Sequence, residues 1–175
     1  MNFKHLANRI RNLKPSNAED DIRNLNKLLS YHQDMLFSVD IVNEIFSFSL
    51  LINFFAAGAL LCLAAVNVIA GSSFYDYIRH TTFLLVALAD MYYVCKHADN
   101  LMTLSTDISD AFAEHPWYNG SIYYQRMLVF PIARAQRPAA LYAYKFFVVS
   151  MESFQSLLTS SYQFFTLIKA RFDEE

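Results

Sequence analysis

A row of polar side chains runs along the last apolar segment of the chain. Its members recur every three or four residues, which places them on one face of an α-helix; this polar stripe comprises Glu152, Gln155, Ser156, Thr159, Gln163 and Thr166. The opposite face carries Phe147, Phe154, Leu157, Phe165 and Ile168. In lipid, such a stripe must meet another helix or water. It either forms hydrogen bonds between helices or lines an aqueous pore built from several copies.

Other reactive groups are not arranged for catalysis. The five histidines lie far apart, without metal-ligand spacing. No nucleophile elbow, P-loop or dinucleotide fingerprint occurs. Cys62 and Cys95 are predicted to be reduced packing residues, and Asp90 is either an ion site or a carboxyl satisfied by its neighbours. We therefore predict no enzyme activity, no metal and no cofactor.

The composition is that of an apolar chain. Hydrophobic residues make up 55% of the 175 residues and charged residues 17%, with a mean hydropathy of +0.21. A net charge of −2 leaves no basic excess to neutralise phosphates, so a nucleic-acid partner is not expected. These values leave a compact helical domain or a membrane protein.

The longest uncharged run decides between these two classes. No Asp, Glu, Lys or Arg occurs between Glu44 and Asp76. As a helix, residues 46–70 would be about 37 Å long, enough to cross a bilayer core of about 30 Å. The run is apolar on every face, and a chain of this size could hardly surround it. We predict a transmembrane helix that lipid surrounds.

Two weaker runs predict further membrane spans. Residues 78–104 are interrupted by Asp90 and Lys96, and the run that carries the polar stripe has one charge, Glu152, between Lys145 and Lys169. The predicted fold class is therefore all-α: a polytopic membrane protein with three transmembrane helices and cytoplasmic helical extensions. The predicted segments are a cytoplasmic segment 1–44, spans 45–70, 78–104 and 139–169, an extracellular link 71–77, a cytoplasmic anchor region 105–138 and an extracellular tail 170–175.

Basic residues set the expected orientation. Residues 1–44 carry six Lys and Arg, the link 71–77 carries none, and residues 96–145 carry five. Because cytoplasmic flanks are enriched in Lys and Arg, the N-terminus is expected in the cytoplasm and the C-terminus outside.

Amphipathic helices are predicted on the cytoplasmic side. Apolar residues recur with a helical period over residues 20–47, after a capping box at Ser16 and Glu19. A continuation of the second span is expected to end near His115, and a short helix is expected over residues 122–135, with Pro131 able to kink it. Their apolar stripes need protein cover, so we predict subunit contacts here and expect charges at Leu25 or Leu128 to abolish oligomers.

Several motifs match a known family in order and spacing. They are Trp117-Tyr118, Arg134-Ala135-Gln136-Arg137-Pro138, Ser150, Phe154, Ser161-Tyr162 and Phe165-Thr166-Leu167, with Cys95, Asn100, Ser105 and Ala111 upstream. In these residues the chain resembles the insect odorant receptor family over residues 20–170. The chain holds the equivalents of spans five to seven, as a C-terminal part of such a receptor would.

The resemblance implies the orientation that the charges give independently. It implies an odorant-gated cation channel of olfactory sensory neurons at the plasma membrane, usually a tetramer with a co-receptor subunit, with a volatile ligand. It also implies a cytoplasmic anchor for subunit contacts, to which we assign Trp117, Leu128, Arg134 and Arg137. A gustatory-type receptor, a membrane adaptor without transport and a soluble helical bundle remain alternatives.

We also predict which residues bind the ligand and which form the gate. Phe83, Ala87 and Met91 recur at four-residue spacing in the second span and are predicted to line an odorant pocket, or else to pack against lipid or core. The family's pore narrows near the extracellular end of its last span, and the resemblance places Phe165 at a constriction there. The polar stripe adds Thr159, Gln163 and Thr166 as candidate pore residues. Phe165 and Thr159 lie on different faces, so the sequence leaves open which face lines the pore.

Overall fold

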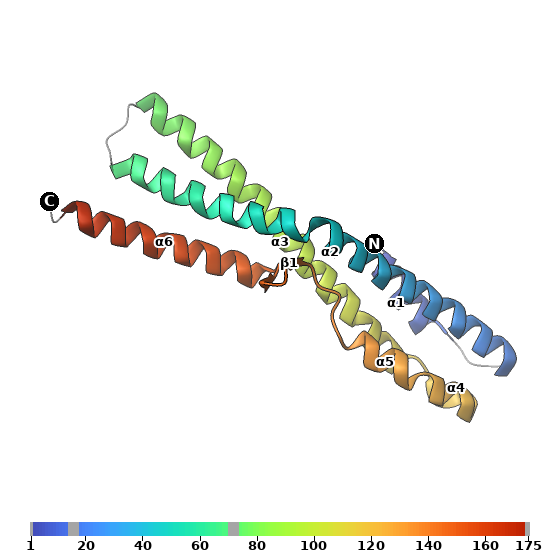
Figure 1. Ribbon diagram of the computed structural model, residues 1–175. Helices are drawn as coiled ribbons and strands as arrows, with labels where there is room; N and C mark the ends of the chain where they lie inside the picture. The colour runs from blue at the N-terminus through green and yellow to red at the C-terminus, as the bar shows by residue number, and fades with distance from the viewer. Residues whose placement is uncertain (1, 14–17, 70–73, 174–175) are drawn as a thin grey trace. The chain divides into compact units, whose positions relative to one another are not determined.

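A computed structural model describes residues 2–13, 18–69 and 74–173, and helices dominate it (Figure 1). The capping box at Ser16 and part of the link 71–77 lie outside the described residues. The elements in chain order are α1 (Asn2–Arg11), α2 (Ala18–Ile69), α3 (Phe74–Glu114), a 3₁₀ turn η1 (Trp117–Asn119), α4 (Ile122–Met127), α5 (Val129–Ala135), β1 (Tyr142–Ala143), β2 (Phe147–Val148) and α6 (Met151–Asp173).

The chain forms two compact units. The first unit comprises Met1–Glu44 and Asn100–Ala140, and the second comprises Ile45–Asp99 and Leu141–Glu175. Helices α2 and α3 each contribute one part to each unit. The first unit thus contains most of the helices predicted outside the membrane, and the second contains most residues of the predicted spans.

The first unit has a closed apolar core. The apolar face of α1 is almost fully buried, with Leu6, Ala7 and Ile10 at 0% exposure. It packs with residues of α2, α3, α4 and α5 in one cluster whose larger members are Leu25, Leu28, Met35, Ile108, Phe112, Tyr124 and Leu128. Arg11 then pairs with Asp107 (Nη2 to Oδ1, 2.6 Å) and Glu114 (Nε to Oε2, 2.5 Å), which joins the end of α1 to α3 and raises the pKa of the guanidinium.

A buried histidine, His115, forms hydrogen bonds with two residues of this core. The Nδ1 atom of His115 lies 2.7 Å from the Phe112 carbonyl oxygen, and its Nε2 lies 3.1 Å from the Tyr124 hydroxyl. A carbonyl only accepts, so Nδ1 carries the proton and Nε2 accepts from Tyr124. Burial lowers the pKa of His115 and raises that of Tyr124, which keeps both groups neutral.

The helix predicted over residues 122–135 is instead two helices. It breaks at Leu128, upstream of the expected kink at Pro131. The restart at Val129 puts Pro131 in the first turn of α5, where a helix does not need the missing N–H.

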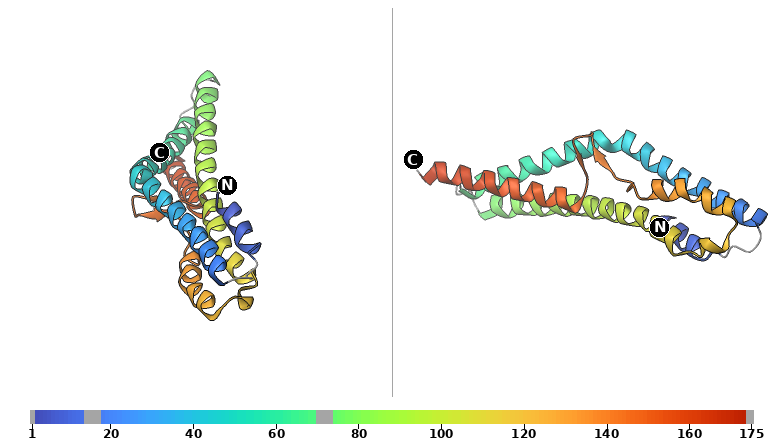
Figure 2. Two further views of the ribbon diagram at one scale, coloured as in Figure 1. Left: turned by 90° about the vertical axis from the view of Figure 1, so that its right-hand side faces the viewer. Right: turned by 90° about the horizontal axis from the view of Figure 1, so that it is seen from below.

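The second unit packs parts of α2, α3 and α6 side by side (Figures 1 and 2). Its buried cluster is small: Phe54, Ala57, Met91, Cys95, Ala98, Ala143 and Val149. Among the described residues, one helix, α2, is long and apolar enough to cross a membrane by the usual hydropathy criterion; its best window has a mean hydropathy of 2.1 and is only 11% buried. The weaker runs in α3 and α6 fall below that criterion, as their charged residues led us to expect.

The last helix is shorter than the predicted span 139–169, because α6 begins at Met151. Before it, β1 and β2 form an antiparallel hairpin, with Tyr142 opposite Val148 and Ala143 opposite Phe147. The turn places Tyr144 and Lys145 at φ 45° and 65°, a left-handed conformation that interrupts any helix. Ser150 then caps α6 by accepting from the Ser153 N–H at 3.2 Å.

Candidate functional site

The two faces of α6 have different surroundings. Side chains that are partly buried against the second unit recur on one face: Phe154, Leu157, Leu158, Ser161, Phe165 and Ile168. All six residues of the polar stripe are exposed. At about 100° per residue, Phe165 lies about 120° around the helix from Thr159. Of the residues predicted for the pore, Thr159, Gln163 and Thr166 therefore share the outward face, and Phe165 belongs to the packed face.

Hydroxyl groups in the stripe bond to their own helix. Thr159 Oγ1 donates to the Gln155 carbonyl at 3.0 Å, and Thr166 Oγ1 donates to the Gln163 carbonyl at 2.8 Å. Because each hydroxyl already donates its proton to a backbone carbonyl, it can only accept a hydrogen bond from a neighbouring group. This exposed face therefore presents acceptor oxygens of Thr159 and Thr166, the Glu152 carboxylate, and the amides of Gln155 and Gln163, which both donate and accept.

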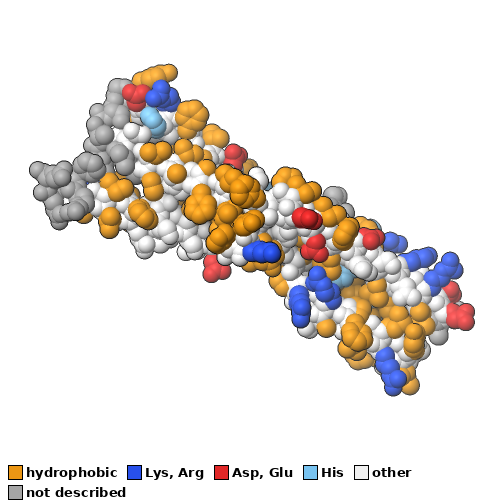
Figure 3. Space-filling view, in the orientation of Figure 1, with side chains coloured by type: hydrophobic (Ala, Val, Ile, Leu, Met, Phe, Trp, Pro, Cys, Tyr) orange, Lys and Arg blue, Asp and Glu red, His pale blue; other side chains and the backbone are white. Residues whose placement is uncertain are grey.

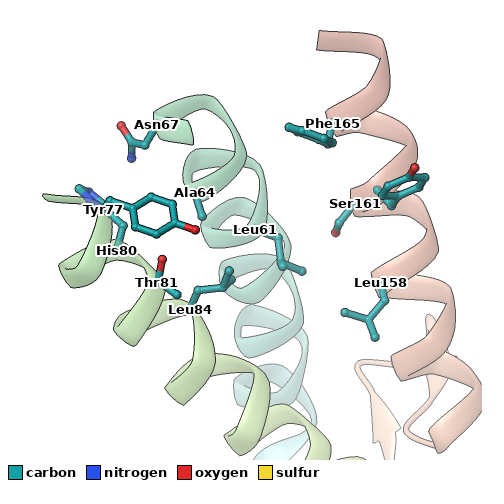
Figure 4. Close-up of a pocket in the computed structure, with 11 residues that line it drawn as sticks. Leu61, Ala64, Asn67, Tyr77, His80, Thr81, Leu84, Leu158, Ser161 and Phe165 are labelled. Atoms are coloured by element: carbon teal, nitrogen blue, oxygen red, sulfur yellow. The ribbon is translucent and has the colours of Figure 1, made fainter. Parts of the chain in front are cut away.

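A cavity of about 370 Å³ lies behind the stripe, between α2, α3 and α6. Figure 4 shows Leu158, Ser161 and Phe165 entering it from α6, with Leu61 and Ala64 opposite on α2. Helix α3 contributes Tyr77, His80, Thr81 and Leu84, and Asn67 and Tyr162 complete the lining. Phe165 thus forms part of the wall of a cavity in the second unit.

One polar group of this cavity bonds within its own helix. His80 Nδ1 lies 2.7 Å from the Asp76 carbonyl oxygen. Because that oxygen can only accept, Nδ1 is the donor in this contact.

The residues predicted for an odorant pocket lie in different environments. Phe83 is 65% exposed, Ala87 is partly buried, and Met91 is 1% exposed inside the core cluster. A spacing of four residues advances about 40° around a helix, so this row turns from the outward face of α3 into its packed face. None of the three lines the cavity of Figure 4. Their role in ligand binding stays a prediction.

Four α3 residues line this cavity, Tyr77, His80, Thr81 and Leu84, and sequence reasoning missed the last three. These four cavity residues occupy one face of α3 at the spacing of a helical stripe. That periodicity was the available signal. It does not show which neighbouring helix covers the face, and the contacts with α2 and α6 supply that information.

The residues assigned to the anchor region also separate into exposed and buried ones. Trp117 is 42% exposed, and Arg134 and Arg137 are exposed, with Arg134 Nη1 donating to the Arg137 carbonyl at 3.4 Å. Leu128 is only 3% exposed and belongs to the core of the first unit. Four large apolar side chains of α4 and α5 are exposed instead: Ile122, Tyr123, Val129 and Phe130, at 61–82% exposure.

Comparison with known proteins identifies the family. The family model described as 7tm odorant receptor matches residues 1–162. The chain belongs to the odorant receptor family. It is 32% identical to putative odorant receptor 92a and 29% identical to odorant receptor 67a, both of Drosophila melanogaster, over 98% of this chain in each case.

Solved structures show the same fold. The insect olfactory receptor OR5 from Machilis hrabei superposes with a TM-score of 0.84 over 95% of this chain and 43% of its own, at 18% identity. The structure of that receptor in complex with eugenol gives 0.77 over 83% of this chain and 39% of its own, at 17% identity. The resemblance to the odorant receptor family and the fold class, an all-α polytopic membrane protein, are confirmed.

The matches extend over only part of each relative. The chain spans 42% of odorant receptor 92a and 44% of odorant receptor 67a. The activity, ligands and partners of a whole receptor are therefore proposals for this chain.

Proposed function

We propose that this odorant receptor chain acts as a subunit of an odorant-gated cation channel in olfactory neurons, together with a co-receptor subunit. The observation that carries the proposal is the polar stripe of α6. All six of its side chains are exposed, whereas the partly buried face of α6 carries mostly apolar residues. A stripe of this kind needs water or another polar helix, and several α6 helices placed around an axis would provide both.

The stripe's chemistry favours cations. Glu152 supplies a carboxylate at one end, and the hydroxyl and amide groups beyond it supply oxygen acceptors. Repeated around an axis, the oxygen atoms would replace part of the hydration of a cation, and the Glu152 carboxylates would repel anions. The proposed orientation is that expected from the basic residues: N-terminus in the cytoplasm, C-terminus outside and the first unit on the cytoplasmic side.

Phe165 is proposed to act from behind the pore wall. To enter a pore that the stripe lines, its ring would have to move through about 120° around the helix axis. In its observed position it packs toward α2 and α3 with Ser161 and Leu158 (Figure 4). It would then influence gating through the position of α6, and Gln163 and Thr166 would contact permeating ions directly.

Odorant recognition is proposed to involve the outer half of α3. Phe83 presents its ring outside the contacts of the second unit, where further spans of a whole receptor would cover it. Subunit contacts are proposed to use the exposed apolar side chains Ile122, Val129 and Phe130.

The channel role is tested by ion permeability. The chain would be co-expressed with an insect odorant co-receptor subunit, and currents evoked by a panel of volatile odorants would be recorded. Gln163→Ala is expected to change the permeability ratio of large to small monovalent cations. Phe164→Ala, an exposed neighbour off the stripe, is the matched control and is expected to leave that ratio unchanged. Equal ratios in both variants and the unaltered chain would contradict a pore lining by the stripe.

A further inference from the structure

We propose that a hollow between α1 and α2 in the first unit binds an anion that carries two or more phosphate groups, either a soluble compound or the headgroup of a lipid. The hollow has a volume of about 620 Å³. It shares no residue with the polar stripe or with the cavity of Figure 4. Its exposure to phosphates of the cytosol rests on the orientation proposed above, but binding itself does not depend on the channel activity.

Basic side chains converge on this hollow from both helices. His5 and Arg9, one turn apart on α1, line it together with Lys27 of α2. No Asp or Glu occurs among the described residues of the lining. Because charges of one sign around a concave surface add their potentials, the hollow attracts anions more strongly than any one of these groups would.

The acidic residues of the same face lie outside the hollow. On α2 the lining extends from Asn24 to Tyr31, and Asp20 and Asp34 come about one helical turn beyond its two ends. Neither of these carboxylates lines the hollow. An anion bound between the two helices would therefore meet the cations without an acidic group in the lining.

A second arginine of α1 shows what pairing within the unit looks like. Arg11 bonds to Asp107 and Glu114 of α3, so its charge is balanced inside the protein. Within the described part of the chain, Arg9 and Lys27 form no salt bridge. Two cations that line one hollow without carboxylate partners are available to phosphate oxygens, the acceptors that bind such cations well.

The remaining groups of the lining suit an organic phosphate. The Asn24 amide and the Tyr31 hydroxyl can donate further hydrogen bonds. Leu13 and Leu28 add apolar surface, and Leu28 belongs to the core of the unit at 8% exposure. The volume falls within the range of ligand pockets, about 300–1,000 Å³. The hollow therefore accommodates phosphate groups together with the carbon body that joins them.

Direct binding tests the proposal. The chain would be placed in phosphatidylcholine nanodiscs and titrated calorimetrically with inositol 1,4,5-trisphosphate, with empty nanodiscs and uncharged inositol as controls. We expect saturable binding of the trisphosphate that weakens as the salt concentration rises, and no binding of inositol. Absence of saturable trisphosphate binding would overturn the proposal. A pore that the polar stripe does not line would leave these results unchanged, so the proposed channel function and this site fail separately.

Variants locate the site. Arg9→Gln and Lys27→Gln each remove one charge from an exposed side chain, so they are expected to keep the fold and to weaken trisphosphate binding about fivefold each. Lys4→Gln removes the same charge from α1 and is the matched control. Lys4 lies about 140° around the helix from Arg9 and outside the lining, so its loss is expected to leave the affinity unchanged. Equal weakening by Arg9→Gln and Lys4→Gln would show a general attraction of the basic surface and contradict a site in the hollow.

Doped nanodiscs distinguish the two sources of the phosphates. Phosphatidylinositol 4,5-bisphosphate presents the phosphate-bearing headgroup in the membrane, and phosphatidylserine at equal charge is the control. If the headgroup reaches the hollow, the bisphosphate lipid weakens binding of the free trisphosphate more than phosphatidylserine does. Equal binding in both kinds of nanodisc supports a soluble anion. Each of these results upholds the site when Arg9→Gln weakens the binding of the free trisphosphate.

Discussion

The two units of the chain bury their apolar side chains in different ways. In the first unit, helices from both parts of the chain cover one another, so Leu6, Leu25 and Phe112 are at 0% exposure. In the second unit, Phe55, Leu63 and Phe83 are 60–73% exposed, although the segment between Glu44 and Asp76 is the most apolar of the chain. The first unit completes a core from its own residues. The second leaves surface that only lipid or other helices can cover.

Charged side chains are also distributed differently between the two units. On the face shown in Figure 3, Lys, Arg, Asp and Glu gather over residues of the first unit, and hydrophobic side chains predominate over the helices of the second. In the first unit, buried polar groups such as His115 and Ser105 are paired within the unit. The difference teaches that exposed apolar surface in the second unit extends along whole helix faces that lipid or other helices must cover. In the first unit it is confined to local patches on a finished core, such as the one proposed for subunit contacts.

The largest effect is expected from a charge at Leu128. This residue is 3% exposed, so Leu128→Asp would bury an unpaired carboxylate and unfold the first unit. Phe130→Asp, at 82% exposure two residues away, should keep the fold and weaken only subunit association. Limited proteolysis reports the fold and cross-linking reports association. We expected charges at Leu25 or Leu128 to abolish oligomers. Both side chains are buried in the core of the first unit, so loss of oligomers in these variants would report unfolding and would not locate an interface.

Replacing one phenylalanine of each unit with alanine tests whether the two units differ in packing. Phe112→Ala in the core should destabilise the chain by about 3–5 kcal/mol. Phe83→Ala, on the open face of α3, should cost less than about 1 kcal/mol. Thermal unfolding of the chain in nanodiscs compares the two. Similar losses would mean that the second unit is as closed as the first.

The smallest expected effect is a pH dependence confined to the first unit. Burial lowers the pKa of His115 and of His32, for which the nearby Arg134 adds to the effect. The unfolded chain then binds protons more tightly than the folded one, so the stability is complete above about pH 6.5 and decreases as the pH falls below it. Proteolysis of the first unit should accelerate in that range, and less so in His115→Phe and His32→Phe. An acceleration of the same size in both variants would exclude these two histidines as its cause.

Features that depend on a single helix or motif could be predicted from the sequence. The uncharged run after Glu44 predicted the long apolar helix, and His115-Pro116 marked the end of α3 to within a residue or two. The polar stripe could be placed on one face because spacing alone determines it. The family could be recognised because order and spacing of its motifs persist in the sequence.

Features that depend on contacts between distant residues were not predictable. The sequence could not decide whether Phe165 or the stripe faces α2 and α3, because the stripe could meet either another helix of the same chain or water. The hairpin before α6 needs two consecutive residues at positive φ, Tyr144 and Lys145, which are not usual turn residues. The cavity around His80 arises where three helices meet, and no one segment shows it.

Cysteine accessibility tests most directly the claim that the exposed polar face of α6 lines the pore. Gln163→Cys, Phe165→Cys and Phe164→Cys would each be expressed with the co-receptor subunit in a chain carrying Cys62→Ser, and a membrane-impermeant cationic thiol reagent would be applied from outside during odorant stimulation. We expect the reagent to block current at Gln163→Cys and to have little effect at the other two positions. Block at Phe165→Cys with none at Gln163→Cys would contradict the claim and place the packed face of α6 in the pore.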